Sequence, residues 1–247
     1  MEKLNTGEVE DLKKVALEDI KKFKKDHYTA SNSILAITGD INENELENIL
    51  NKYLSKLPKG TKIKEPVITA SNKSNKEIIK SNYNQKHIKI DYNGFKLKDK
   101  KRYALTLLAF FIDTYLNRVL KQEKGLAYVI SAKDFYSNSF GVFSIYTATD
   151  NLNIIDEINK ELSNIKNNLN NLTNEEIEIA KRNIISDLVF SLENSSQMLD
   201  FYATNYLFKN TLTLQREIEN YKQVSKDDIV KVFNYIVTQE QKVTILE

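Results

Sequence analysis

The pattern of apolar and polar positions divides the chain into helices and short strands. Helical spacing of apolar residues predicts helices over 9–26, 42–54, 102–124, 154–169, 174–208, 214–221 and 227–235. Short apolar or alternating runs predict strands over 33–41, 87–95, 127–136, 142–149 and 242–247. These elements together predict an α+β protein.

The end of the chain repeats the pattern of its beginning. DIKKFKKDHYTASNSILAI (19–37) and DIVKVFNYIVTQEQKVTIL (228–246) align without a gap. Each is a helix, a short connection and a strand, which indicates two copies of one domain plan. The first copy has only its closing elements. We therefore expect the closing part of an incomplete domain, a linker and a complete second α+β domain, at 1–60, 61–76 and 77–247.

Composition restricts the chemistry that the chain can perform. It has no cysteine, and its two histidines, His27 and His87, lie far apart in unrelated surroundings. Cysteine and histidine are the usual zinc ligands, so a histidine-rich or thiolate metal centre is not expected, and both histidines are interpreted as structural or surface residues. The acidic run 175–178 falls in the first turn of a helix capped by Thr173, where carboxylates complement the helix dipole.

Charge and hydropathy exclude further classes of function. The 36 basic and 34 acidic residues are interleaved, so no nucleic-acid footprint is present. No apolar run is long enough for a membrane span. The charged N-terminal stretch has no apolar core of a secretory signal, so a cytoplasmic location is expected.

The sharpest local signal is LKQEKGLAYVISA (120–132). Here a helix ends, Gly125 reverses the chain and a strand begins. The junction is predicted to place Lys121, in the last helical turn, close to Tyr128 at the start of the strand. An ammonium and a phenol in this position could donate hydrogen bonds to a peptide carbonyl.

Two ordered signatures then resemble a known family. GLAY after a basic helix is followed by a hairpin and by a helix opened with TNEEIEIAKRNI, and the opening stretch LEDIKKFKKDHYTASNSILAITGDI also fits. The chain resembles the C-terminal, non-zinc region of the pitrilysin and insulinase family of zinc metallopeptidases, which includes the mitochondrial processing peptidases. The resemblance covers nearly the whole chain. It implies tandem domains, each with a sheet and helices packed on one face.

The resemblance also implies where the catalytic chemistry lies. Active domains of the family carry HxxEH, in which two histidines hold zinc and the glutamate activates water. Neither this motif nor its reverse is present here, since His27 precedes Tyr-Thr-Ala-Ser and His87 precedes Ile-Lys-Ile-Asp. We therefore expect no catalytic or metal-binding residue in this chain. Zinc is expected only in a catalytic partner or an upstream domain.

A second family feature is an arginine and a tyrosine, seven positions apart, that contact the substrate backbone. Tyr128 matches the tyrosine, whereas Lys121 stands at the arginine position and lacks the bidentate guanidinium fork. Arg118, one helical turn earlier, could partly substitute. The alternatives are packing at a strand start for Tyr128 and complementation of a helix C-terminus for Lys121.

The leading hypothesis is a non-catalytic, peptide-contacting half or partner subunit of a pitrilysin-type peptidase, acting on unfolded peptides. The alternatives are a structural or assembly subunit, and a fragment of a full-length zinc protease. The apolar faces at Leu46, Ile49 and Leu50 need cover, which predicts a partner or a homo-oligomer. The resemblance implies that such a partner is a zinc-bearing HxxEH subunit or upstream domain.

Overall fold

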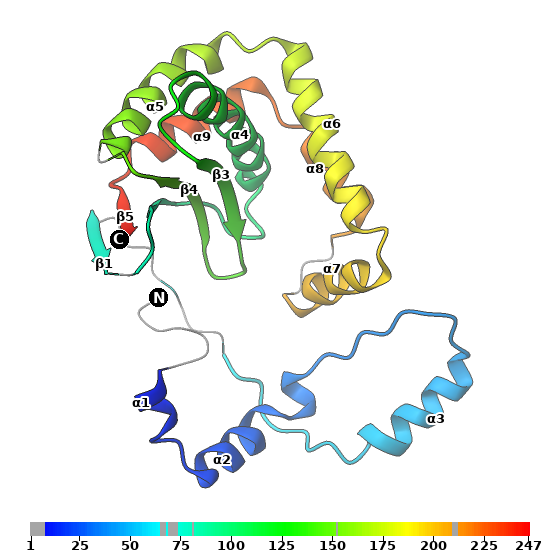
Figure 1. The fold of residues 1–247 in the computed structure, drawn as a ribbon. Helices are drawn as coiled ribbons and strands as arrows, with labels where there is room; N and C mark the ends of the chain where they lie inside the picture. The colour runs from blue at the N-terminus through cyan, green and yellow to red at the C-terminus, as the bar shows by residue number, and fades with distance from the viewer. Residues whose placement is uncertain (1–7, 65–67, 69–73, 81, 152, 209–211) are drawn as a thin grey trace. The chain divides into compact units, whose positions relative to one another are not determined.

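The computed structural model describes residues 8–64, 68, 74–80, 82–151, 153–208 and 212–247. The chain divides into two compact units (Figure 1). The first unit comprises 1–65 and 194–207, and the second comprises 66–193 and 208–247. In the described part of the chain, no helix is both long and apolar enough to cross a membrane.

The second unit contains a five-stranded sheet of order β1-β5-β2-β4-β3. The strands are β1 Asn75–Ile79, β2 Lys86–Asn93, β3 Val129–Tyr136, β4 Gly141–Thr149 and β5 Lys242–Leu246. β1 and β5 run parallel, and the other neighbours are antiparallel. The C-terminal strand thus lies inside the sheet, between β1 and β2.

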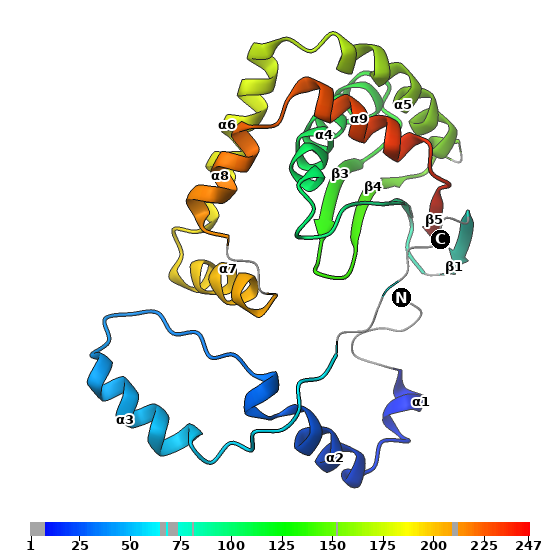
Figure 2. The same ribbon diagram turned by 180° about the vertical axis from the view of Figure 1, so that it is seen from behind.

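One face of this sheet is apolar and buried. On β2, Ile88, Ile90 and Tyr92 are buried, while the intervening Lys89 is exposed, as the two-residue period of a strand requires. Helices cover the buried face (Figure 2), and the helices of this unit are α4 Lys101–Leu116, α5 Ile154–Asn170, α6 Asn174–Ser191, α8 Leu214–Lys222 and α9 Lys226–Val237. The predicted α+β fold, with a sheet and helices packed on one face, is confirmed.

Local sequence signals set where several of these helices begin. Thr173 and Glu176 bond each other's backbone N–H groups in a capping box at the start of α6. Ser225 and Asp228 do the same for α9. Both caps satisfy N–H groups that the first helical turn leaves unpaired.

The first unit has helices, and none of its described apolar side chains is buried. Its elements are α1 Val9–Leu12, α2 Leu17–His27, a 3-10 turn Ala30–Asn32, α3 Glu43–Leu54 and α7 Ser195–Leu207. Within 8–64 the buried residue is Thr29. Hydrogen bonds hold the 3-10 turn to the segment after α3: Ala30 N–H donates to Pro58 O and Ser31 N–H to Lys59 O, both at 2.9 Å.

Two predicted elements are wrong in this unit. The segment 33–41 forms no strand, because a strand needs a hydrogen-bonded neighbour and the described residues supply none beside it. The helix predicted over 9–26 is interrupted after Leu12, and α2 restarts where the Asp19 carboxylate accepts the Ala16 N–H at 2.9 Å.

Two further boundaries differ from the predictions. The helix predicted over 174–208 is two helices, α6 and α7, because Leu192 ends the first and the Asn194 side chain accepts the Ser196 N–H at 2.9 Å as the second begins. β1 includes Asn75 and Lys76, for which the sequence predicts the linker 61–76. Positions 65–67 and 69–73 of that linker lie outside the described residues.

Candidate functional site

A widened helical turn at the end of α4 carries the candidate cations Arg118 and Lys121, and Tyr128 follows it directly before β3. α4 does not continue as an α-helix to Lys124, as predicted, but passes into a π-helix over Asn117–Glu123. The π-helical turn closes where the Lys124 N–H donates to Val119 O at 3.0 Å. Gly125 then takes a φ of +64°, a left-handed conformation that glycine adopts without strain, and reverses the chain towards β3 as predicted.

Tyr128 is presented to solvent at the entrance of β3. Its N–H donates to Ala148 O at 2.9 Å, which fixes the residue beside β4. The side chain is 54% exposed, and its hydroxyl donates to Asp150 Oδ2 at 2.7 Å. This hydrogen bond and the negative charge of Asp150 raise the pKa of Tyr128. The phenol therefore stays protonated at neutral pH and remains a hydrogen-bond donor.

Lys121 and Arg118 lie on the π-helix with Tyr128 close by along the chain. The Leu126 N–H donates to Leu120 O at 2.8 Å, so the end of the π-helix and the approach to Tyr128 are held together. Arg118 pairs with Glu123 at 2.8 Å, and both side chains are about half exposed. Lys121 is exposed and forms no ion pair with another described residue. The substrate-binding roles of all three side chains stay predictions.

Lys124, which the sequence did not single out, anchors this junction to α5. Its ammonium donates to Glu157 at 2.8 Å and to Glu161 at 2.7 Å. Tyr115 also donates to Glu161, at 2.8 Å. Although burial alone would raise the pKa of the Glu161 carboxyl, its hydrogen bonds to Lys124, Asn164 and Tyr115 lower it. No local pattern reveals this anchor, because the partners lie on a different helix.

Side chains of the helix occupy two backbone groups on the outer edge of β3. This strand is the last in the sheet order, so its outward backbone groups have no neighbouring strand within the described part of the chain. Asp113 Oδ1 accepts the Ala132 N–H at 2.8 Å, and Asn117 Nδ2 donates to Ile130 O at 3.0 Å. Occupied edge groups cannot pair with an added strand. The Ala132 N–H and the Ile130 carbonyl are therefore not available to a peptide that would add as a further strand.

The two histidines of this chain lie in different units, and each contacts a residue of its own unit. No group of three or more His, Cys, Asp or Glu side chains lies within metal-binding reach among the residues that the structure describes. His27 lies in the first unit, where its Nδ1 is 3.0 Å from Phe23 O. His87 lies in the second unit, where its Nδ1 is 2.7 Å from the Tyr146 hydroxyl. Each ring is engaged locally, and no chemical step is assigned to a metal in this chain.

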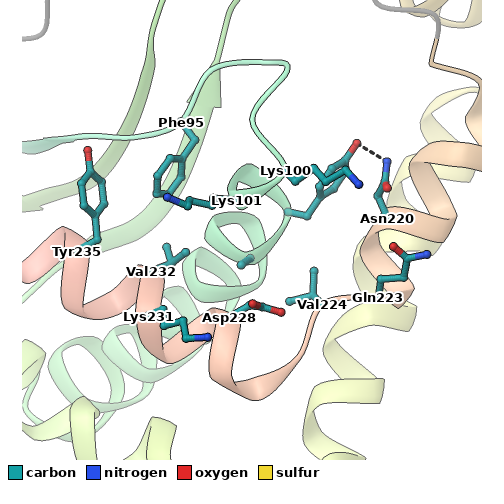
Figure 3. Close-up of a pocket in the computed structure, with 12 residues that line it drawn as sticks. Phe95, Lys100, Lys101, Asn220, Gln223, Val224, Asp228, Lys231, Val232 and Tyr235 are labelled. Carbon is teal, nitrogen blue, oxygen red and sulfur yellow. Dashed lines mark hydrogen bonds between the residues drawn. The ribbon is translucent and has the colours of Figure 1, made fainter.

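A pocket of about 440 Å³ lies at the other end of α4 (Figure 3). Phe95, Ala104 and Val232 are among its apolar lining residues, and Lys100 and Lys101 are among its cations. At 1.5 Å per residue, the helical path from there to Lys121 is roughly 30 Å long. The pocket is therefore separate from the Tyr128 junction.

Comparison with known proteins assigns the chain to a family. Residues 14–184 match the family described as the peptidase M16 inactive domain. This chain belongs to that family. The match covers most of the chain and confirms the resemblance to zinc metallopeptidases of the pitrilysin type, in their non-zinc region.

Curated relatives of the chain are named zinc proteases. An uncharacterised zinc protease of Rickettsia felis is 24% identical over 225 residues, which cover 86% of this chain and 53% of that protein. The zinc protease PqqE of Helicobacter pylori is 23% identical over 254 residues, covering 97% of this chain and 56% of that protein. This chain thus spans about half the length of the curated relatives it matches.

Solved structures share the fold at low sequence identity. A protease from Helicobacter pylori has a TM-score of 0.84 and 20% identity, covering 98% of this chain and 61% of that chain. A peptidase M16 inactive domain from Pseudomonas fluorescens has a TM-score of 0.84 and 17% identity, covering 98% and 60%. A chain of complex III2 from Candida albicans has a TM-score of 0.82 and 16% identity, covering 99% and 62%.

Proposed function

We propose that this chain is a non-catalytic, peptide-contacting half or partner subunit of a pitrilysin-type zinc metallopeptidase. Membership of the M16 inactive-domain family supports the non-catalytic part. The observation that carries the peptide-contacting part is the exposed, backbone-anchored Tyr128, whose hydroxyl remains a donor. Zinc and the water-activating base are then supplied by another chain or domain that carries HxxEH.

At this junction the Tyr128 hydroxyl donates to a backbone carbonyl of an extended substrate peptide. The hydroxyl now donates to Asp150, so it has to rotate away from that carboxylate, or the peptide has to replace Asp150 as the acceptor. The exposed ammonium of Lys121 contributes a second, non-directional attraction for carbonyl or carboxylate oxygens. Sequence-independent backbone contacts of this kind suit unfolded peptides as substrates.

Peptide binding by the purified chain tests the proposal. Fluorescein-labelled β-casein, an unfolded protein, is titrated with the chain and followed by fluorescence anisotropy. Tyr128→Phe removes only the donor, and loss of one hydrogen bond is expected to weaken binding about 3- to 10-fold. Lys121→Ala is expected to weaken binding and to reduce its dependence on salt.

Tyr206→Phe is the matched control, because Tyr206 is also an exposed tyrosine, 75% accessible, and lies on α7. It is expected to leave the affinity unchanged. If Tyr128→Phe and Lys121→Ala both bind as the unmodified chain does, the peptide-contacting role is refuted. Chelator-sensitive peptide hydrolysis by the pure chain would refute the non-catalytic role.

A structural or assembly subunit is the second candidate. It is favoured by the lysine at position 121, which lacks the bidentate fork of arginine, and by the fold shared with a chain of complex III2. A scaffold of this kind would bind its assembly partner and not β-casein. The same titration therefore separates the two candidates.

A further inference from the structure

We infer that the pocket at the N-terminal end of α4 binds an organic carboxylate with a compact apolar body. The inference goes beyond the proposed function, because the pocket is separate from the Tyr128 junction and all its lining residues belong to the second unit. They come from the loop after β2, the start of α4, the end of α8 and α9 (Figure 3). Its volume of about 440 Å³ lies within the range of small-molecule pockets, roughly 300–1,000 Å³.

The apolar part of the lining is already packed. Phe95, Ala104, Val224 and Val232 line the pocket, and each is at most 8% exposed. The Phe95 ring stacks on that of Tyr235, with ring centroids 5.1 Å apart, and Tyr235 is 44% exposed. An apolar body in the pocket therefore contacts a firm apolar surface and removes part of the Tyr235 ring from water, which is favourable in proportion to the area.

Hydrogen bonds hold the walls of the pocket in place. The Tyr103 hydroxyl joins α4 to α8, because it donates to Glu217 Oε2 at 2.7 Å and accepts from the Asn220 amide at 2.9 Å. The capping box of Ser225 and Asp228 fixes the start of α9. The three helices that form the pocket are thus positioned without a ligand, as is usual for small-molecule sites.

The charge around the pocket is mainly positive. Lys100, Lys101 and Lys231 line it and are exposed. None of their ammonium groups forms an ion pair or a hydrogen bond with another residue that the structure describes. The lining carboxylate, Asp228, accepts hydrogen bonds from the Ser225 N–H at 3.0 Å and hydroxyl at 2.6 Å. Three cations and one anion leave a surplus of two positive charges, which attracts an anionic ligand.

One of these cations lies beside the apolar lining. The ammonium of Lys101 is 5.7 Å from the centroid of the Phe95 ring (Figure 3). A ligand whose apolar body packs against Phe95 therefore brings a negative group within reach of Lys101. The site combines apolar burial with charge attraction, so it favours a molecule that carries both features.

The lining indicates a carboxylate and not a phosphate. Phosphate sites use glycine-rich loops or free N–H groups at a helix N-terminus. The lining residues that the structure describes include no glycine, and the Lys101 N–H at the start of α4 already donates to Asp99 Oδ1, at 2.9 Å. The lysines attract as point charges, which suits a singly charged anion.

An NMR titration of the full, isotope-labelled chain tests the inference. Cinnamate has a compact apolar body and a carboxylate, and cinnamamide is its neutral analogue. Cinnamate is expected to shift the amides of 100–104 and 228–235 saturably, and cinnamamide to bind about 5-fold more weakly, because it forms no ion pair. Equal affinities for the two compounds, or saturable shifts only outside these segments, would overturn the inference.

A second titration identifies the source of the carboxylate. The dipeptide acetyl-Leu-Phe ends in a carboxylate beside an apolar side chain, and its C-terminal amide is the neutral control. Tighter binding of the dipeptide than of cinnamate indicates the C-terminus of a peptide as the ligand, and the reverse indicates a free organic acid. Either order supports the pocket. Failure of both carboxylates to shift 100–104 and 228–235 refutes it.

Matched substitutions test which residues bind the ligand. Lys100→Ala/Lys101→Ala is expected to weaken cinnamate binding about 3- to 20-fold, by loss of two ion pairs, and to reduce its dependence on salt. Lys24→Ala/Lys25→Ala removes the same charge from an exposed pair on α2 and is expected to leave binding unchanged. Equal effects of the two double variants would contradict a local site.

A pocket-filling substitution tests the place of the apolar body. Ala104→Leu adds a side chain to the lining, and leucine has a high helix propensity, so α4 is expected to form. This variant should bind neither cinnamate nor cinnamamide at the pocket amides. Circular dichroism checks its folding, and the lysine variants decide the question if it does not fold. Unchanged cinnamate binding by folded Ala104→Leu would overturn the inference.

Discussion

Two arginine–glutamate pairs of the second unit differ mainly in burial. This difference predicts how much free energy of unfolding is lost when the glutamate of each pair is removed. Arg102 bonds Glu217 through Nη2, 2.7 Å from each carboxylate oxygen, and the two side chains are 1% and 4% exposed. Arg118 bonds Glu123 at 2.8 Å, but these side chains are 55% and 52% exposed. Glu217→Ala and Glu123→Ala therefore remove the same kind of partner from two different environments.

The buried arginine depends heavily on its carboxylate. Its guanidinium lies 4.0 Å from the ring centroid of Tyr103 and 4.4 Å from that of Tyr136, so water cannot replace the lost partner. Its Nη1 already has no hydrogen-bond partner among the described residues. Truncation of one partner of a buried ion pair costs about 3–5 kcal/mol, whereas an exposed pair contributes about 0–1 kcal/mol.

Urea and thermal unfolding followed by circular dichroism measure the difference. At roughly 2–4 °C per kcal/mol for a unit of this size, Glu217→Ala is expected to lower Tm by about 6–20 °C. Glu123→Ala is expected to change Tm by less than about 4 °C. The double variant Arg102→Met/Glu217→Leu should recover most of the loss, because no buried charge is left unpaired. Equal effects of the two alanine variants would refute this reasoning.

Two further predictions concern a glycine and a helix cap. Gly60 has a φ of +62°, and an added Cβ would lie 2.3 Å from the side chain of Thr29, whereas Gly125 has a φ of +64° and open space around it. Gly125→Ala should therefore lower the stability of its unit by only about 1–2 kcal/mol, through backbone strain, whereas Gly60→Ala should lower the stability of its unit distinctly more. Hydrogen exchange of amides in the respective unit measures both changes. Hydrogen bonds from the Ser225 side chain and backbone lower the pKa of Asp228. The stability that Asp228 contributes is present above the unfolded pKa of its carboxyl, which is about 4. This stability is lost as the pH falls through the lower pKa that the carboxyl has in the folded chain. Asp228→Asn should cost about 1 kcal/mol at pH 7 in urea unfolding, with the difference from the unmodified chain shrinking below about pH 4, and a pH-independent difference would contradict this account.

The sequence by itself determined the elements whose stability is local. Helical spacing located α4, α5 and α9, and the side chains of Thr173 and Ser225 placed the starts of α6 and α9. Gly125 marked the reversal before β3. These features depend on residues within one or two turns of each other, so a pattern read along the chain contains the necessary information.

Strand formation was decided by tertiary structure. The segments 34–36 and 243–245 have similar patterns, yet only the second is a strand, because β1 and β2 supply its hydrogen-bond partners. The same dependence on distant partners placed Asn75 and Lys76 in β1, where the sequence indicated a linker. A strand has no internal hydrogen bonds, so its own residues do not specify whether it forms.

The arrangement around the candidate site was also beyond the sequence. Tyr128 and Lys121 are identified from a motif, but the hydrogen bonds of Asp113 and Asn117 to the edge of β3 depend on the packing of α4 beside that strand. The pairing of Arg102 with Glu217 joins residues 115 positions apart. Burial makes the loss of one partner of such a pair costly in stability, and burial depends on the packing of the whole folded unit.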